Sequence, residues 1–235
     1  SGNRERSALG PILASQFVFN RVDVRTMNKI DDLTAKHADD PAGYARAYLD
    51  YLASCFVAID CDAIDAFVEL LLAARKSGHS VFFIGNGGSA ATASHFANDI
   101  SIGTRTGDTL PFRAVSLTDN VAVMTALAND EGYDRMFVDQ LRVHMRDGDS
   151  LVAISASGNS PNLIEAVDYA KTRGATVVGL TGFDGGRLRE KSDISLHVPT
   201  DTGEYGPVED VHMIFDHLIG SYLIAEVKRQ ALANA

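Results

Sequence analysis

The chain has 235 residues, of which 46% are hydrophobic, and its formal net charge is −10 at pH 7. This length and composition are enough for one α/β domain with a full core. The acidic balance, without a basic cluster, excludes binding of nucleic acid through its phosphates and disfavours anionic membrane surfaces. No stretch has the length of a transmembrane helix. Cys55 and Cys61 form no recognisable disulfide or metal motif, so we expect two packing residues in a cytoplasmic protein.

The first part of the chain is predicted to be helical. Apolar side chains recur at helical spacing over residues 8–78, and DDPAG at 39–43 is typical of a turn between two helices. We therefore predict an N-terminal helical extension over residues 1–78 that packs on the core. The apolar positions that carry this prediction are Tyr48, Tyr51, Leu52, Phe56, Ile59, Ile64, Phe67, Leu70 and Leu71.

From residue 79 to residue 235 the pattern alternates between strand and helix. The predicted strands are 80–84, 112–116, 150–155, 175–180 and 193–198. The predicted helices lie near 89–101, 119–128, 132–144, 161–173 and 207–230. This alternation implies an α/β domain with a doubly wound, five-stranded parallel sheet that helices cover on both faces. Ligands of such sheets bind at the carboxyl ends of the strands.

Two Ser/Gly-rich loops follow predicted strands. The first is GNGGS at 85–89, and the second is SASGNSPN at 155–162. Each precedes a predicted helix, so glycines let the backbone approach a ligand while hydroxyls and free N–H groups bind an anion. Pro161 suits the first position of a helix. One such loop is compatible with a purely structural turn, but two of matching design predict a site for a small phosphorylated ligand.

Imidazoles and carboxylates gather on two of the predicted helices. His95 and Asp99 are four residues apart and share one face of the helix after the first loop. The last helix carries a second set within an arc of roughly 140°, namely Glu209, His212, Asp216 and His217. Two imidazoles and two carboxylates suit a zinc-type divalent ion. Any one of these residues alone is compatible with a solvated surface position, and for Asp210 and Asp216 that interpretation stays open.

A nicotinamide-dependent oxidoreductase is one alternative. Residues 85–90 match the Gly-x-Gly-x-x-Ala dinucleotide fingerprint formally. However, Asp119, the candidate ribose acceptor, lies about thirty residues further on instead of about twenty. That function would also leave the second serine loop unexplained. No lysine follows the glycines as in a triphosphate-binding loop, and no Gly-x-Ser-x-Gly elbow occurs, so Ser157 and Ser160 are better anion donors than nucleophiles.

Taken together, these segments resemble the sugar isomerase (SIS) domain family, and within it the phosphoheptose isomerases. The similarity runs in order over about residues 45–230. Its motifs are GNGGS at 85–89 with ASHFA at 93–97, LTD at 117–119, ANDEGY at 128–133, ISASGNSPN at 154–162, GLTGFDGG at 179–186, and a last helix with His212 and His217. Each motif alone is weakly specific, whereas their combination in this order is highly specific.

The resemblance implies an aldose-ketose isomerase that converts sedoheptulose 7-phosphate to D-glycero-D-manno-heptose 7-phosphate through an enediolate. It assigns the sugar phosphate to the two loops and sugar hydroxyls to an aspartate further on. The implied substrate-binding residues are Asn86, Gly87, Ser89, Asp119, Ser155, Ser157 and Ser160. The resemblance further implies a homotetramer with active sites between subunits, in which the N-terminal helices pack between protomers.

The resemblance also implies a divalent metal, zinc, held by His95, Asp99, Glu209 and His217. It assigns the catalytic base to Asp99 and the acid to His217. Glu209 shares the proton transfer, because a metal-bound carboxylate such as Asp99 is a weaker base. Three positions depart from the family's usual residues, since Asp99 replaces Glu, Glu209 replaces Gln and Ala156 replaces Thr. A catalytic group misplaced by about 1 Å can lose on the order of a hundredfold in rate. The departures are therefore compatible with a related sugar phosphate as substrate.

The second alternative is a non-catalytic module of the same fold. Such a module would bind a sugar phosphate or a protein partner, as does a family member that associates with a bacterial replication initiator. The presence of both His95 and His217 favours the enzyme, because a module that only binds a partner has no need of that pair.

Overall fold

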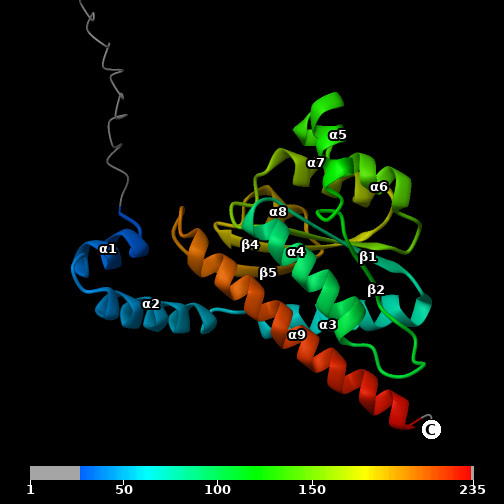
Figure 1. Cartoon of the computed structure of the whole chain (residues 1–235), viewed down its shortest axis with the longest axis horizontal. Coiled ribbons are helices and arrows are strands. Elements are labelled where there is room, and N and C mark those ends of the chain that lie inside the picture. Colours follow the sequence, from blue (N-terminus) through cyan, green and yellow to red (C-terminus); the bar gives the residue numbers. More distant parts are fainter. Residues whose placement is uncertain (1–26, 234–235) are drawn as a thin grey trace, which may run out of the picture.

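The computed structural model describes residues 27–233 and contains one five-stranded sheet (Figure 1). The strands are β1 (Ser80–Gly85), β2 (Arg113–Ser116), β3 (Ser150–Ser155), β4 (Thr176–Phe183) and β5 (Ile194–Pro199). Their order is β2-β1-β3-β4-β5, and all neighbours are parallel. The chain therefore reverses its winding direction at β1 and β3, the point where such sheets bind ligands. The predicted doubly wound α/β fold is confirmed.

Helices cover both faces of the sheet, because strand side chains alternate between two cores. Val81 and Phe83 enter one core, whereas Phe82 and Ile84 enter the other. The first core is covered by α3 (Cys61–Ser77), α4 (Gly88–Asn98) and α9 (Tyr205–Ala233). The second is covered by α5 (Val121–Asp130), α6 (Val138–His144), α7 (Pro161–Thr172) and α8 (Gly186–Lys191). Of these, α8 was not predicted, because a helix of six residues that itself begins with a glycine shows too little periodicity.

Two irregular helical turns complete the described elements. A π-helical turn, Asp99–Gly103, continues α4, and a 3-10 turn, Tyr133–Arg135, precedes α6. Single π turns inside helices are frequent at functional sites. This one begins at Asp99, a residue that the sequence assigns to the site.

The N-terminal extension contains α1 (Lys29–Lys36) and α2 (Pro41–Phe56), which lie beside the start of α9 (Figure 1). Helices are thus present over the described part of the stretch 8–78, whereas residues 8–26 lie outside the described residues. No helix in the described part is both long enough and apolar enough to cross a membrane. Cys55 is buried as expected, but Cys61 is exposed, so the prediction of a packing role is wrong for Cys61.

Hydrogen bonds hold the extension to the start of α9. The buried carboxylate of Glu204 accepts from the backbone N–H groups of Ile30 and Asp201, both at 3.1 Å, and from the hydroxyl of Tyr51. Each of these donors comes from a different segment. The extension therefore orients the first turns of α9, which carry Glu209.

His212 is a fully buried imidazole of α9. Its Nε2–H donates to the carbonyl oxygen of Thr181 at 3.3 Å. Burial lowers the pKa of His212 from 6.5 to about 4 because the charged ring would lose its hydration; the bond to Thr181 opposes this shift and the charge of His197 adds to it. The unfolded chain therefore binds this proton more tightly. The contribution of neutral His212 to the free energy of unfolding is therefore fully present above pH 6.5, and it is lost as the pH falls toward 4.

We expect this group alone to lower the free energy of unfolding by about 1 kcal/mol between pH 6 and pH 5. Urea unfolding at the two pH values, in the wild type and in His212→Gln, measures how much of the loss in unfolding free energy comes from His212. The variant should lose less stability over the interval, whereas the control His144→Gln, which changes an exposed imidazole, should follow the wild type. The same loss of stability in His212→Gln and in the wild type would contradict this assignment.

Candidate active site

The two Ser/Gly-rich loops lie side by side, because they follow the neighbouring strands β1 and β3. An amide pair joins them. Nδ2 of Asn86 donates to Oδ1 of Asn162 at 3.0 Å, and Nδ2 of Asn162 donates to Oδ1 of Asn86 at 2.9 Å. The hydroxyl of Tyr133 donates to the same Asn86 oxygen at 2.9 Å. The side chain of Asn86, which the sequence assigns to substrate, thus holds one loop against the other.

Asn162 is a candidate functional residue that sequence reasoning missed. It is buried in the first turn of α7, and its Oδ1 also accepts from the backbone N–H of Leu163 at 3.0 Å. A satisfied buried polar network holds its members in one arrangement. Asn162 therefore sets how the two loops face each other, and the only signal in the sequence is its place at the end of the second loop.

Both loops need glycine for their backbone. Gly87, which precedes α4, has a φ of +53°, and Gly158 has a φ of +64°. A Cβ at Gly158 would also lie 1.9 Å from the carbonyl oxygen of Gly185. Glycine is therefore required at Gly158 both by conformation and by the close approach of the loop after β4.

A small pocket lies between the loops and the start of α9. Its volume is about 150 Å³, which is below the roughly 300–1,000 Å³ of sites that enclose a whole small ligand. The polar residues that line it are Asn86, Ser89, Ser155, Ser157, Ser160, Tyr205 and Glu209. Its size and chemistry suit the phosphate end of a ligand rather than a complete sugar phosphate.

The three serines of the second loop differ in the hydrogen bonds they already make. Oγ of Ser155 is buried and accepts from the backbone N–H of Gly158 at 3.1 Å. Oγ of Ser157 accepts a long bond of 3.4 Å from the N–H of Asn159. Ser160 precedes α7 and makes no capping bond to that helix. Ser157 and Ser160 therefore offer the more available hydroxyls, whereas Ser155 shapes the loop.

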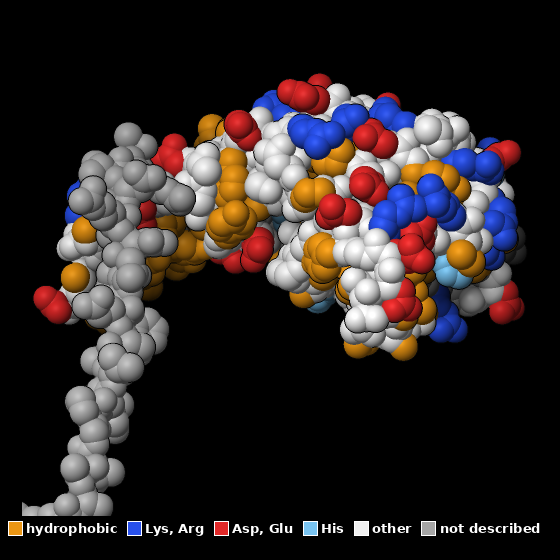
Figure 2. All heavy atoms as spheres, turned by 90° about the horizontal axis from the view of Figure 1, so that it is seen from above, with side chains coloured by type: hydrophobic (Ala, Val, Ile, Leu, Met, Phe, Trp, Pro, Cys, Tyr) orange, Lys and Arg blue, Asp and Glu red, His pale blue; other side chains and the backbone are white. Residues whose placement is uncertain are grey.

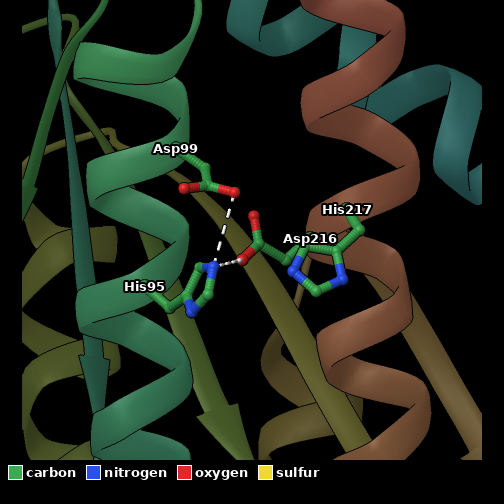
Figure 3. A group of neighbouring side chains, drawn as sticks. All are labelled: His95, Asp99, Asp216 and His217. Carbon is green, nitrogen blue, oxygen red and sulfur yellow. Dashed lines mark ion pairs between the residues drawn. The ribbon is translucent and has the colours of Figure 1, made fainter.

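Two imidazoles and two carboxylates from α4 and α9 meet in a second group (Figure 3). One ligand atom each of His95, Asp99, Asp216 and His217 lies within 4.8 Å of the others. Nε2 of His95 is 3.4 Å from Oδ2 of Asp99 and 3.8 Å from Oδ2 of Asp216. The rings of His95 and His217 pack edge to face, with centroids 5.3 Å apart. These nitrogen and oxygen donors can hold a divalent metal ion.

Asp216 is the buried member of this group. Its side chain is 0% exposed, compared with 45% for His95 and 31% for Asp99. Neither carboxylate oxygen of Asp216 has a hydrogen-bond partner within residues 27–233. Burial, followed by the charge of Asp99, raises the pKa of Asp216 to about 6, whereas the two histidines lower it. The interpretation of Asp216 as a surface residue is wrong, because α9 turns this side chain toward α4 (Figure 3).

Glu209 does not lie in this group. Its carboxylate occupies the space beside Gly88, where an added Cβ would be 2.5 Å from a Glu209 oxygen. His95 lies seven residues after Gly88 in α4, Asp216 lies seven residues after Glu209 in α9, and these two side chains approach each other. Because the steps are equal, α4 and α9 run in the same direction. Seven residues of helix span about 10.5 Å. Glu209 thus lies two turns before the group, beside the small pocket, where burial and then the charge of Asp210 raise its pKa.

Asp119 lies beside a larger cavity. This cavity, of about 770 Å³, lies between α4 and β2, and His95 and Asp119 both line it. His95 is therefore a member of the group on α4 and α9 and also lines this cavity. The four residues that the sequence assigns to a metal are thus divided, with three in the group and Glu209 at the pocket.

Comparison with protein families decides the family. The family described as "SIS domain" matches residues 43–182. The chain belongs to the SIS domain family. This SIS-domain match includes both loops together with His95 and Asp99, whereas α9 with His217 follows it.

Similar SIS-domain proteins include curated phosphoheptose isomerases. The phosphoheptose isomerase of Rhodospirillum rubrum is 38% identical over 177 residues, which cover 74% of this chain and 92% of that protein. That of Mycobacterium tuberculosis is 40% identical over 163 residues, covering 69% and 81%. The solved phosphoheptose isomerase GmhA from Neisseria gonorrhoeae has a TM-score of 0.69 and 31% identity, covering 77% of this chain and 97% of that one.

Proposed function

We propose that the chain is an aldose-ketose isomerase that converts sedoheptulose 7-phosphate to D-glycero-D-manno-heptose 7-phosphate. The observation that carries this function is the similarity to phosphoheptose isomerases over nearly the full length of those proteins. The two loops and the group on α4 and α9 supply the chemistry that such a reaction needs. A non-catalytic module is not favoured, because the similar curated proteins are named as isomerases.

The substrate phosphate binds in the small pocket. Ser157 and Ser160 donate their hydroxyls to it, and Ser89 contributes from the first turn of α4. The backbone at Gly87 and the N-terminus of α7 favour a negative charge there through their N–H groups. Because the pocket is small, the sugar chain extends out of it.

The reacting carbons, C1 and C2, lie at the opposite end of the substrate from the C7 phosphate. The group on α4 and α9 begins about two helical turns beyond the pocket, a distance of about 10.5 Å. A sugar chain that follows the two helices brings C1 and C2 to the exposed side chains of His95 and His217 and to the half-buried Asp99. Glu209 and Asp119 then contact sugar hydroxyls on the way.

Proton transfer is assigned to side chains at this end of the site. Asp99 removes a proton from C1 of the ketose, and a proton returns to C2 of the aldose, while the hydroxyl proton moves from O1 to O2. The exposed imidazole of His217 exchanges the proton with the oxygens. Glu209, whose raised pKa makes it a better proton acceptor, assists where the substrate reaches it.

A divalent ion such as zinc, when bound, stabilises the negative charge that develops on the substrate oxygens. His95, Asp99 and His217 would hold it, together with Glu209, the fourth position that the resemblance assigns to the metal. The fit is supported by the two nitrogen and two oxygen donors in reach of one another and by the unpartnered buried carboxylate beside them. A metal-bound Asp99 is a weaker base, which is the reason to keep Glu209 among the proton-transfer groups.

Proton exchange with solvent tests the function. Ketose and aldose phosphates with five, six and seven carbons, incubated with the protein in deuterated water, would be followed by NMR. We expect conversion of the seven-carbon ketose phosphate with deuterium uptake at C1 or C2. Binding of the sugar without conversion or uptake would instead support the non-catalytic module.

We also propose that the chain forms a homotetramer, with a dimer as the next choice. Hydrophobic side chains are exposed on the helical extension, where α2 carries Leu49 and Phe56 and is followed by Val57. Figure 2 shows hydrophobic side chains gathered toward this end of the molecule. Burying these residues against a second subunit would remove apolar surface from water. Light scattering should give a mass near four times 25.2 kDa. A mass near that of one chain would contradict any intersubunit site.

A further inference from the structure

Tyr205, the first residue of α9, brings an aromatic ring to the small pocket between the two loops. Among the described residues that line this pocket, it is the only aromatic one. Tyr205 is 53% exposed, whereas the other apolar lining residues, Ile154 and Ala156, are buried. The serine and asparagine side chains offer hydrogen bonds to phosphate oxygens but little apolar surface to a carbon chain. Tyr205 therefore supplies the accessible apolar surface of the pocket.

The ring of Tyr205 is supported by Phe183, the last residue of β4. The two rings meet edge to face, with centroids 5.0 Å apart and an interplanar angle of 84°, which is a favourable arrangement. Phe183 is buried and has a φ of +54°, and it is the only non-glycine residue between 27 and 233 with a positive φ. Bulky residues rarely adopt this conformation, and where they do it is frequently at a ligand-binding site. The strained residue is thus the one that supports Tyr205.

The end of β4 is fixed between the serine loop and α9. The backbone N–H of Gly182 donates to the carbonyl oxygen of Ala156 in that loop at 2.9 Å. On α9, Val208 packs so closely that an added Cβ at Gly182 would lie 2.5 Å from its side chain. The N–H of Phe183 itself is 3.4 Å from Oγ1 of Thr200. The position of the Phe183 ring is therefore set relative to both sides of the pocket.

The backbone of Tyr205 is fixed as well, because its two neighbours in the chain contact the helical extension. Glu204 is the buried carboxylate that accepts hydrogen bonds from the extension. A Cβ at Gly206 would lie 3.1 Å from the hydroxyl of Tyr48, which donates to Oδ2 of Asp210 at 2.6 Å. Tyr205 is thus a half-exposed aromatic residue that is held in place before any ligand binds. Such preorganisation lowers the entropic cost of a contact with a ligand.

We infer that Tyr205 is a substrate-binding residue, whose ring contacts the carbon chain next to the phosphate. This inference rests on the proposed function, because it concerns the same substrate and the same phosphate pocket. The pocket has a volume of only about 150 Å³, so the carbon that carries the phosphate lies at its rim. There the C–H groups of the sugar pack on the Tyr205 ring and exclude water from it. The ring therefore favours the phosphate ester of a carbon chain over free inorganic phosphate.

A phosphate ester that cannot be isomerised tests this contact apart from the reaction. Sorbitol 6-phosphate has a carbon chain and a phosphate but no carbonyl group, and inorganic phosphate has no carbon at all. In calorimetric titrations we expect Tyr205→Ala to bind sorbitol 6-phosphate about 3- to 15-fold more weakly, the usual contribution of an aromatic contact. Its affinity for inorganic phosphate should stay within about twofold of the wild type. Tyr205→Phe, which keeps the ring, should bind both ligands like the wild type.

The matched control is Tyr222→Ala. Tyr222 lies further along α9, is not among the residues that line the pocket, and is exposed to nearly the same extent, at 55%. This variant should bind both ligands with unchanged affinity. Melting temperatures of all variants show whether a change in affinity comes with a loss of the fold.

Magnetisation transfer in NMR shows the contact directly, which a merely structural role of Tyr205 would not produce. In protein that carries protons only on its tyrosine rings, saturating those rings should transfer magnetisation to the C6 protons of bound sorbitol 6-phosphate. Tyr205→Phe should abolish this transfer while keeping the affinity, because its ring carries no protons in such a sample. Tyr222→Ala should leave the transfer unchanged.

Several outcomes would overturn the inference. Unchanged affinity for sorbitol 6-phosphate in Tyr205→Ala would exclude the contact, and an equal loss for both ligands would mean that the ring only shapes the pocket. A loss in Tyr205→Phe as large as in Tyr205→Ala would assign the contact to the hydroxyl instead. Absence of transfer in the wild type would also refute it. Because sorbitol 6-phosphate is not turned over, these results leave the proposed isomerase activity to its own test by deuterium uptake.

Discussion

Replacing Asp99 by Asn is expected to lower kcat by a factor of about 10²–10⁴, the usual contribution of a general base. The substitution preserves the size of the side chain but removes its ability to accept a proton. Asp99 is 31% exposed, so substrate can reach it, in contrast to the fully buried Asp216. The rate of deuterium uptake at C1 measures the proton-abstraction step directly, and saturation curves separate kcat from KM.

The control for this experiment is Asp168→Asn. Asp168 lies on α7 at the opposite face of the sheet and pairs with Lys191 in an exposed ion pair, which contributes little to stability. This variant should retain the kcat of the wild type. Zinc content is measured alongside, because Asp99→Asn also removes a proposed ligand. If Asp99→Asn turned over at the wild-type rate, Asp99 would not be the base.

The double variant Ser157→Ala/Ser160→Ala is expected to weaken binding of sugar phosphate by about 1–3 kcal/mol. In terms of the dissociation constant this is an increase of about 5- to 150-fold. Both hydroxyls line the small pocket and are weakly engaged in the free protein, so their removal deprives the anion of two donors. Calorimetric titration with inorganic phosphate and with a sugar phosphate measures the effect.

Ser77→Ala provides the matched control for the serine loop. Ser77 is an exposed serine at the end of α3, before the amino end of β1 and thus at the opposite edge of the sheet from the pocket. Its replacement should leave phosphate affinity unchanged. Unchanged affinity in the folded double variant as well would show that the phosphate binds elsewhere.

The sequence by itself predicted the sheet and both loops because these features depend on local chemistry. Strands of a parallel sheet are buried on both faces, so they appear as continuous apolar runs such as Val81–Ile84 and Leu151–Ile154, each followed by turn residues. The loops were recognisable because a backbone that approaches an anion requires glycine and hydroxyl side chains in consecutive positions. The order of these motifs also indicated the family, which the comparisons confirm.

The tertiary structure decided which of these side chains meet. Helical periodicity places Glu209 and Asp216 on the same side of the last helix, but it gives only their angle about the axis. Their height relative to α4 depends on how the two helices are packed, and the contact of Glu209 with Gly88 brings Asp216 to His95. The hydrogen bond between Asn86 and Asn162, 76 residues apart, could not be predicted from the sequence either. The two loops meet only because β1 pairs with β3.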